Sequence, residues 1–311
     1  MRYAIISDIH GNLSAFTAVL KDAERFGAEQ YIFVGDYCSY FPYPNEVINK
    51  MKSLTNSYII RGNEEEYLSL YSKQNPSTWT DGQFQAHYWC YRTINIMNHE
   101  YLAALPKKIS FKDCDIRITV THSSADIYGD IDHKEFSSLK VAEKYEKDSS
   151  YSREKLLREI RGYLRKDEFA TVLQSLPDDV YIFGHTHVQW NSRIGNKVFI
   201  NPGSCGLALD GLSGAPYTLM DISNEEVTII ERRVRYNVDK LIIEFQNSSL
   251  FEAAPVWCTV ILKEMEAGFE RVLPFLQFVE EYANKINDPI RPYSVKTWTD
   301  AYSAWQNNVK T

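Results

Sequence analysis

Seven side chains able to bind a metal ion follow apolar, strand-like runs of the chain. They occur in five short motifs, SDIHGN, GDY, GNE, VTH and GHTH, and are Asp8, His10, Asp36, Asn63, His122, His185 and His187. A single histidine at a strand end is usually an ordinary polar residue with a hydrogen-bond partner, but seven donors at five strand ends are hard to attribute to chance. Imidazole, carboxylate and amide ligands together suit Mn, Fe, Zn or Co better than a closed thiolate zinc site would. These residues therefore indicate chemistry based on transition-metal ions.

The runs before these motifs predict strands that alternate with helices. Residues 2–7, 30–36 and 57–60 are short, apolar and rich in β-branched or aromatic side chains, as buried strands are. Helices are predicted after Asn12 and from Pro44, because apolar residues recur there at helical spacing. Such alternation predicts βαβ units and a sheet with parallel strands. Ligands of open α/β sheets bind at the carboxyl ends of strands, which is where the seven side chains fall.

The remaining segments predict more helix and a second group of strands. Helical patterning covers residues 81–99 and about 133–174, and strands are predicted at 116–122, 180–187, 197–204, 217–222 and 227–234, with a hairpin turn at 223–226. Two apolar stripes at helical spacing occur after Tyr236. We expect a domain of residues 1–236 with a helical insertion at about 126–178, followed by a helical C-terminal extension of residues 237–311.

Composition narrows the class of protein. The 311 residues are 44% hydrophobic, which suits a globular chain with a substantial core, and the net charge of −7 argues against non-specific binding to nucleic acids. The five cysteines are scattered and include no C-x-x-C pair, as in reduced cytosolic proteins. No apolar run reaches the length of a signal peptide or a membrane span. We therefore expect a soluble, cytoplasmic protein with no membrane partner.

In their order along the chain, these motifs resemble those of the calcineurin-like metallophosphoesterases. The resemblance covers about residues 1–234 and includes D-x-H, G-D, G-N, a strand-end histidine, G-H-T-H and the later NPGS, while GDYCSYFPYPNEVI is similar to a segment of bacterial members. It implies an αββα sandwich, an α/β fold, with two metal ions at its rim. By this resemblance one ion is held by Asp8, His10 and His187, the other by Asn63, His122 and His185, and Asp36 bridges both. Asp36, Asn63 and His122 are then also members of the catalytic centre.

The resemblance implies a hydrolase of phosphoester bonds. Two cations held about 3.5–4 Å apart can activate a bridging water, as hydroxide, and neutralise phosphoryl oxygens. We expect a phosphodiesterase or nucleotide-polyphosphate hydrolase acting on a phosphorylated small molecule or nucleotide. The alternatives are a phosphomonoesterase, including a protein phosphatase, and a catalytically weak scaffold of the same fold. A nuclease is disfavoured by the negative net charge.

Position 64 departs from the family pattern, in which many relatives have histidine after G-N. Glu64 stands there instead, and a carboxylate would repel a phosphate where an imidazolium would attract it. Glu64 could have a raised pKa and act as a general acid, or it could point outward as a bystander, or the enzyme could be slow. The bystander interpretation is favoured here. Asn63 is expected to cap the next helix in a capping box with Glu66, and Glu65 is expected to serve the same helix start.

Other polar and aromatic residues allow two interpretations each. Asn12 could cap the first helix, which we favour, or contact the phosphate. Tyr40 and its neighbours Phe41 and Tyr43 could stack on a base or pack against the helical additions. His87 matches no motif and is treated as an ordinary helix residue.

The helical insertion is rich in basic residues. Residues 133–166 contain ten Lys or Arg and six acidic residues, a net charge of +4. They could form a basic cap that attracts phosphorylated substrates, or a solvated helical hairpin held by mixed salt bridges.

Overall fold

In the part of the chain that the structure describes, ten strands form two mixed sheets that pack face to face. The computed structural model describes residues 1–129, 135–223 and 226–308, so parts of the predicted insertion (130–134) and of the predicted hairpin turn (224–225) lie outside the described residues. The first sheet has the order β10-β9-β1-β2-β3 and the second the order β4-β5-β6-β8-β7. The strands are β1 (Arg2–Ile6), β2 (Gln30–Phe33), β3 (Ser57–Ile59), β4 (Lys108–Asp113), β5 (Ile116–Thr121), β6 (Val180–Ile182), β7 (Gln189–Ile194), β8 (Lys197–Pro202), β9 (Ala215–Ser223) and β10 (Glu226–Val234).

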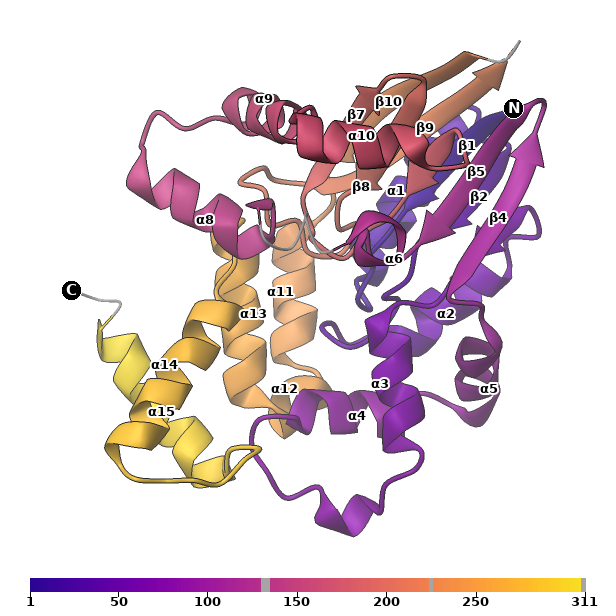
Figure 1. The fold of residues 1–311 in the computed structure, drawn as a ribbon. Helices are drawn as coiled ribbons and strands as arrows, with labels where there is room; N and C mark the ends of the chain where they lie inside the picture. Colours follow the sequence, from indigo (N-terminus) through magenta and orange to yellow (C-terminus); the bar gives the residue numbers. More distant parts are fainter. Residues whose placement is uncertain (130–134, 224–225, 309–311) are drawn as a thin grey trace.

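The side chains of a strand alternate between the two faces of its sheet, and each face packs against a different layer. In β1, Tyr3 and Ile5 join the apolar cluster between the two sheets, whereas Ala4 and Ile6 join the cluster beneath the helices of the first sheet. Successive strand residues point to opposite faces, so β1 is buried on both sides. Helices cover the outer faces of both sheets (Figure 1). The predicted αββα sandwich is therefore confirmed.

Helices on the first sheet come from the N-terminal part of the chain, and those on the second come from the segment between β5 and β6. The first group is α1 (Leu13–Arg25), α2 (Pro44–Lys52), α3 (Asn63–Tyr71), α4 (Gln85–Thr93) and α5 (Ile96–Ala104), and the second is α6 (Ala125–Tyr128), α8 (Ser138–Lys147), α9 (Arg153–Leu164) and α10 (Asp167–Ser175). The helical patterning predicted at 81–99 corresponds to two helices, and the Asn95 side chain caps the second by accepting a hydrogen bond from the Asn98 N–H.

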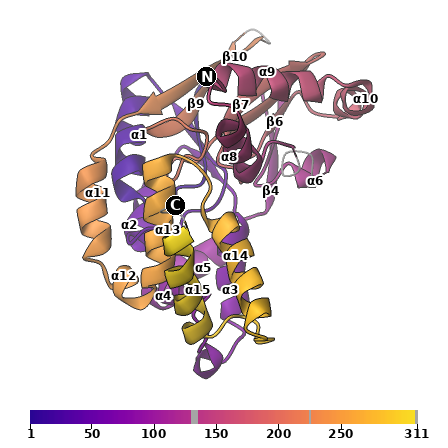
Figure 2. The ribbon, with the colours of Figure 1, turned by 90° about the vertical axis from the view of Figure 1, so that its left-hand side faces the viewer.

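Five more helices follow β10 and lie beside the carboxyl ends of the strands (Figures 1 and 2). They are α11 (Val238–Gln246), α12 (Ser249–Ala253), α13 (Pro255–Ala267), α14 (Val272–Lys285) and α15 (Val295–Asn308). Their apolar side chains pack with Phe41, Leu207 and Leu209 of the sandwich in one cluster. The C-terminal segment is therefore helical, as predicted, and is joined to the loops at the strand ends. None of the described helices combines the length and the apolar composition that a membrane span needs.

Candidate metal centre

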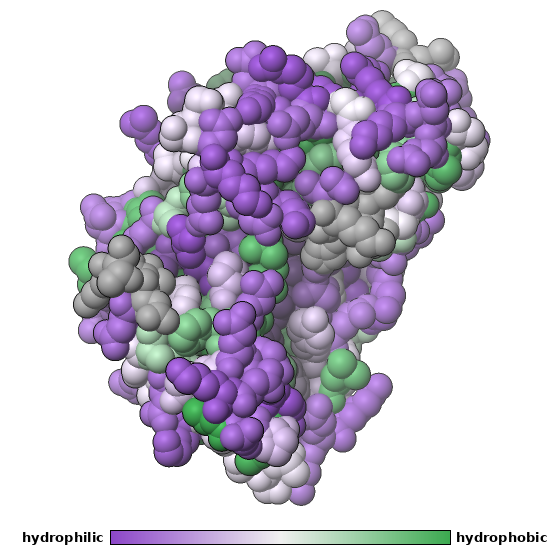
Figure 3. All heavy atoms as spheres, turned by 60° about the vertical axis from the view of Figure 1, so that its left-hand side comes forward, coloured by the Kyte–Doolittle hydropathy of each residue, from purple (hydrophilic) through white to green (hydrophobic). Residues whose placement is uncertain are grey.

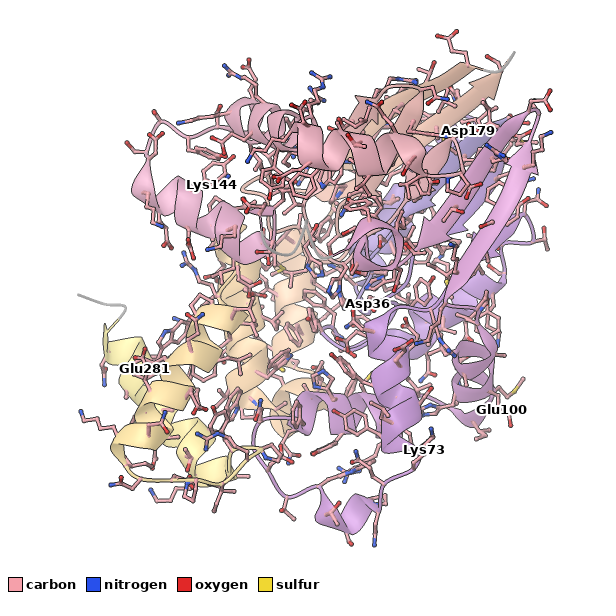
Figure 4. The ribbon with its side chains drawn as sticks, in the orientation of Figure 1. Asp36, Lys73, Glu100, Lys144, Asp179 and Glu281 are labelled. Carbon is pink, nitrogen blue, oxygen red and sulfur yellow. The ribbon has the colours of Figure 1, made fainter. Side chains whose placement is uncertain are left out.

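The seven predicted metal-competent side chains follow the carboxyl ends of five strands. Asp8 and His10 follow β1, Asp36 follows β2, Asn63 follows β3, His122 follows β5, and His185 and His187 follow β6. Because β1, β2 and β3 run parallel in one sheet, and β5 and β6 run parallel in the other, these ends meet at the same rim of the sandwich. Figure 4 shows Asp36 in the middle of the molecule, between α3 and the C-terminal helices.

One group of possible ligands comprises Asp8, His10 and His187, whose nitrogen and oxygen atoms all lie within 4.8 Å of one another. The Nε2 atoms of His10 and His187 are 3.0 Å apart, and Asp8 Oδ1 lies 3.4 Å from His187 Nε2. All three residues are buried. Two imidazoles and a carboxylate therefore converge on one point.

A second group comprises Asp36, His122 and His185, again with atoms within 4.8 Å of one another. Asp36 Oδ2 lies 3.2 Å from His122 Nε2, and Asn63 Oδ1 lies 3.0 Å from the same nitrogen. Asp36 Oδ2 is also 4.0 Å from His10 Nε2 of the first group. Asp36 is thus positioned between the two groups.

Five of the seven residues have left-handed backbone conformations, with positive φ values: Asp8 (52°), His10 (51°), Asp36 (57°), His185 (69°) and His187 (58°). Such conformations are uncommon outside glycine, and each costs about 1–3 kcal/mol, so they persist only where the surroundings enforce them. Their concentration here shows that the fold holds these turns against local backbone preference.

The loop after β2 is held by Glu65. Its carboxylate accepts the backbone N–H groups of Asp36 (3.0 Å), Tyr37 (2.9 Å) and Gly62 (2.8 Å). The capping prediction for this helix is therefore wrong: Gly62 is the N-cap, and Glu65, rather than Glu66, accepts the N–H of the N-cap residue. Burial and the charge of Asp36 raise the pKa of Glu65 to about 7, despite its three N–H donors. Sequence reasoning missed this positioning residue because its partner loop lies about 28 residues away.

Glu64 is buried, so the interpretation that it points outward is wrong. Its Oε2 accepts the Ser39 hydroxyl at 2.5 Å and lies 3.6 Å from His87 Nε2. Burial, reinforced by the charge of Asp36, raises the pKa of Glu64 well above its usual range. Burial therefore disfavours the charged form of this carboxyl group, which lies next to Asn63.

The electrostatics of the two groups favour carboxylates paired with imidazoles. Burial opposes ionisation of Asp36, but the charge and hydrogen bond of His122, together with the charge of His10, outweigh it and lower the Asp36 pKa. Burial likewise opposes a charged His122, yet Asp36 raises its pKa to about 10. The pKa of His10 falls to about 4, through burial and the nearby His187. A cation at the second group would replace the proton that His122 otherwise carries.

The donor set fits metal ions. Asp8 Oδ1 and His187 Nδ1 are buried polar atoms without a hydrogen-bond partner in the described structure, and leaving such atoms unpaired is costly. Asp8 Oδ1 faces His187 Nε2 and His10 Nε2, so a cation between them would satisfy it. The position of Gly62 has no room for a side chain, because a Cβ there would stand 2.1 Å from Asp36 Oδ1.

A sequence model of the calcineurin-like phosphoesterases matches residues 1–189. The chain belongs to the calcineurin-like phosphoesterase family. Membership supports hydrolysis of phosphoesters and implies metal ions at the two groups. An uncharacterized protein of Methanocaldococcus jannaschii is 26% identical over 252 residues, which are 76% of this chain and 88% of that protein.

Solved structures share the fold of this calcineurin-like phosphoesterase. A metallophosphoesterase from Sphaerobacter thermophilus is 22% identical, covers 86% of this chain and 99% of its own, and superposes with a TM-score of 0.60. A hypothetical protein from Pyrococcus horikoshii is 18% identical, covers 84% of this chain and 97% of its own, and gives a TM-score of 0.56.

A cavity of about 740 Å³ adjoins the metal centre of this phosphoesterase. Asn63, His185 and His187 line it together with residues of α3, α13, α14 and the segment between α3 and α4. Figure 3 shows the corresponding face hollowed near its middle, with hydrophobic residues at the rim. The C-terminal helices therefore form one wall of the space next to the ions' ligands.

The two predicted substrate-binding residues, Tyr40 and Asn12, have different surroundings in the structure. Tyr40 lines the cavity, stacks on His10 with ring centroids 4.0 Å apart, and packs against the C-terminal helical cluster. These contacts support the packing interpretation, and stacking on a base stays a prediction. Asn12 is buried: its Oδ1 caps α1 through the Ala15 N–H, and its Nδ2 donates to the Gly206 carbonyl at 2.8 Å. Asn12 is therefore assigned to helix capping, and a phosphate contact is not proposed for it.

The basic residues of the insertion are engaged in local contacts. Lys144 pairs with Glu159 at 2.6 Å, and Lys147 pairs with Glu143 at 3.3 Å. Arg158 likewise pairs with a neighbouring glutamate. Figure 4 shows Lys144 on α8 well away from Asp36. These contacts favour the salt-bridged hairpin over the basic cap.

Proposed function

We propose that this chain is a dinuclear-metal phosphodiesterase. Asp8, His10 and His187 hold one ion, Asn63, His122 and His185 hold the other, and Asp36 is shared. When bound, the two ions supply Lewis acidity and a nucleophile from water at neutral pH. The observation that carries the proposal is the position of Asp36 Oδ2, 3.2 Å from His122 Nε2 and 4.0 Å from His10 Nε2, between two separate donor groups.

The charge of the adjoining cavity favours a diester over a monoester. Among its described lining residues are four carboxyl groups, Glu64, Asp81, Glu264 and Glu270, and no lysine or arginine. A phosphodiester carries one negative charge, whereas a monoester carries up to two and finds no lysine or arginine on the described wall to offset the second. A phosphomonoesterase is therefore the weaker enzymatic alternative.

The chain's own residues supply orientation and a proton. Glu65 fixes the loop that carries Asp36, and Asp36 Oδ1 accepts the Glu64 N–H at 3.0 Å, so the shared carboxylate is held from two sides. Glu64 lines the cavity together with Asn63, and we assign it the donation of a proton to a leaving-group oxygen, the task of histidine in many relatives. General acids of this kind contribute about 10²–10⁴-fold in rate.

The test compares bis(p-nitrophenyl) phosphate with p-nitrophenyl phosphate on protein stripped by chelation and reloaded with Mn, Fe, Zn or Co. The expected result is stoichiometric metal binding, metal-dependent turnover and a higher kcat/KM for the diester. Asp36→Asn should abolish turnover, while Asp115→Asn, at an exposed turn, should not. Failure to bind any of these metals would support the scaffold alternative, and a preference for the monoester would support the phosphomonoesterase.

A further inference from the structure

The cavity beside the metal centre has the chemistry of a receptor for a flat group without negative charge. Its described lining includes the aromatic side chains Tyr40, Tyr67, Tyr71, Trp79, Phe84 and Trp257. Trp257 meets Tyr40 at 63° and His87 at 61°, with centroids 5.7 Å apart in both pairs, so these rings form a corner rather than a stack. Aromatic faces stack well on nucleobases, whichever base is present.

Carboxyl groups of the lining accept hydrogen bonds from neighbouring residues. Asp81 accepts the Phe84 N–H and the Tyr88 hydroxyl, and Glu264 accepts the N–H groups of Arg271 and Val272. A carboxyl oxygen can accept more than one hydrogen bond, so Asp81 keeps capacity for a ligand's N–H donors. The exocyclic amino and imide groups of bases are such donors. A polyphosphate tail, by contrast, would find no lysine or arginine on the described wall.

Two buried nitrogen atoms among the lining residues lack partners in the described structure. They are His87 Nδ1 and Trp257 Nε1. His87 belongs to α4 and Trp257 to α13, so the two nitrogens come from different parts of the chain that meet at this corner, one before β4 and the other after β10. Unpaired buried nitrogens are unusual in folded proteins, and a polar ligand could satisfy them after a small side-chain movement.

The position and size of the cavity connect it to the reaction. Asn63, His185 and His187 belong both to its wall and to the metal centre, so a phosphate at the ions directs one ester substituent into it. Its volume of about 740 Å³ lies within the usual range for small-molecule sites, about 300–1,000 Å³, and far exceeds the needs of a methyl or ethyl group. Tyr67 and Leu273 are 42% and 39% exposed, so the cavity is reachable from solvent.

We propose that this cavity binds the nucleoside part of a phosphodiester that carries a single phosphate group, and that the C-terminal helices thereby set substrate class. The inference rests on the proposed function for the position of the phosphate, but not for nucleoside binding itself. It also selects among the expected substrates, because a nucleoside with one phosphate suits this wall and a nucleoside polyphosphate does not.

The kinetic test compares two esters with the same leaving group, thymidine 5′-(p-nitrophenyl phosphate) and methyl p-nitrophenyl phosphate, on the metal-loaded protein. The wild type should prefer the thymidine ester in kcat/KM by at least tenfold. Trp257→Leu should reduce that preference about fivefold or more, chiefly through KM, as loss of base stacking predicts. Trp89→Leu is the matched control, because Trp89 belongs to the same helical cluster without lining the cavity, and its preference should equal that of the wild type.

A second variant keeps the test decisive if Trp257→Leu fails to fold. Tyr67 is 42% exposed, so Tyr67→Leu should fold normally and still reduce the preference for the thymidine ester. Equal kcat/KM for the two esters in the wild type would overturn the proposal, as would a stronger preference for a choline p-nitrophenyl phosphate ester. Tighter inhibition by ADP than by AMP would also contradict it.

A binding measurement separates this inference from the proposed function. Calorimetric titration of chelator-treated protein with thymidine should show saturable binding that Trp257→Leu weakens and Trp89→Leu does not. Thymidine binding without hydrolysis of either ester would support the cavity inference and count against the phosphodiesterase. Hydrolysis of the methyl ester, with no thymidine binding and no preference, would support the enzyme and overturn the cavity inference.

Discussion

Replacing Glu65 with glutamine should weaken metal binding although Glu65 is not itself a ligand. Its two carboxylate oxygens accept three buried N–H groups, with Oε2 serving Asp36 and Gly62 and Oε1 serving Tyr37. A glutamine can keep only one carbonyl oxygen in this position. If that oxygen serves Asp36 and Gly62, the amide NH₂ must face the Tyr37 N–H, and two donors then meet.

The magnitude follows from the bonds lost. One charge-assisted hydrogen bond disappears and a buried N–H is left unpaired, which should reduce the free energy of unfolding by about 1.5–3 kcal/mol. The loop carrying Asp36 is then less firmly held, and loss of a supporting residue of this kind typically reduces metal affinity about 10–100-fold. Both effects should appear in the same variant.

The assay is urea unfolding of the metal-free protein together with titration of Mn²⁺ or Zn²⁺, and Glu66→Gln is the matched control. Glu66 lies next in sequence but is partly exposed and pairs with Lys107 and Arg61 at the surface. Such pairs contribute about 0–1 kcal/mol, so the control should bind metal normally. If Glu65→Gln behaved like Glu66→Gln in both measurements, the positioning role assigned to Glu65 would be refuted.

Three further results are expected. Gly62→Ala should lose metal binding and at least 100-fold in turnover, because its Cβ would stand 2.1 Å from Asp36 Oδ1; metal affinity like that of the wild type would contradict the crowding argument. Glu64→Gln should slow hydrolysis of an alkyl ester about 10²–10⁴-fold and that of a p-nitrophenyl ester much less, and equal effects on both would eliminate the general-acid role. Metal affinity measured by titration should rise with pH towards about 10, because Asp36 raises the pKa of His122 to about 10 and binding must displace that proton; affinity independent of pH would count against His122 as a ligand.

The metal centre was predictable because its residues lie beside strands that the sequence makes conspicuous. Short apolar runs precede Asp8, Asp36 and His122, and parallel strands bring their carboxyl ends to one rim whatever the distance along the chain. Even so, the sequence placed the start of α3 one residue too late. Asn63 is a good capping residue in isolation, but in the fold its Oδ1 faces His122, and Gly62 takes the cap.

Two strands escaped prediction for different physical reasons. β4 (Lys108–Asp113) lies at a sheet edge, where charged residues replace the apolar pattern of a central strand. β7 (Gln189–Ile194) is also an edge strand and is largely polar, yet it is mostly buried, because it packs beneath α9 and α10. In both cases the tertiary surroundings, rather than the local pattern, determine the conformation.

The cavity could not be foreseen either. His87 and Trp257 are separated by 170 positions and match no motif, and only the packing of α4 near α13 brings their rings within 5.7 Å. Walls of this kind are assembled from residues that individually resemble ordinary core, so no spacing in the sequence marks them.

The left-handed turns at Asp8, His10, Asp36, His185 and His187 have an evolutionary consequence. Glycine would adopt these conformations without strain. The present residues are therefore retained only while selection favours catalysis. A descendant that kept the sandwich solely for protein assembly would gain stability by drifting to glycine at these five positions. Glycine at these places in a homologue would therefore be an early sign of lost enzymatic activity.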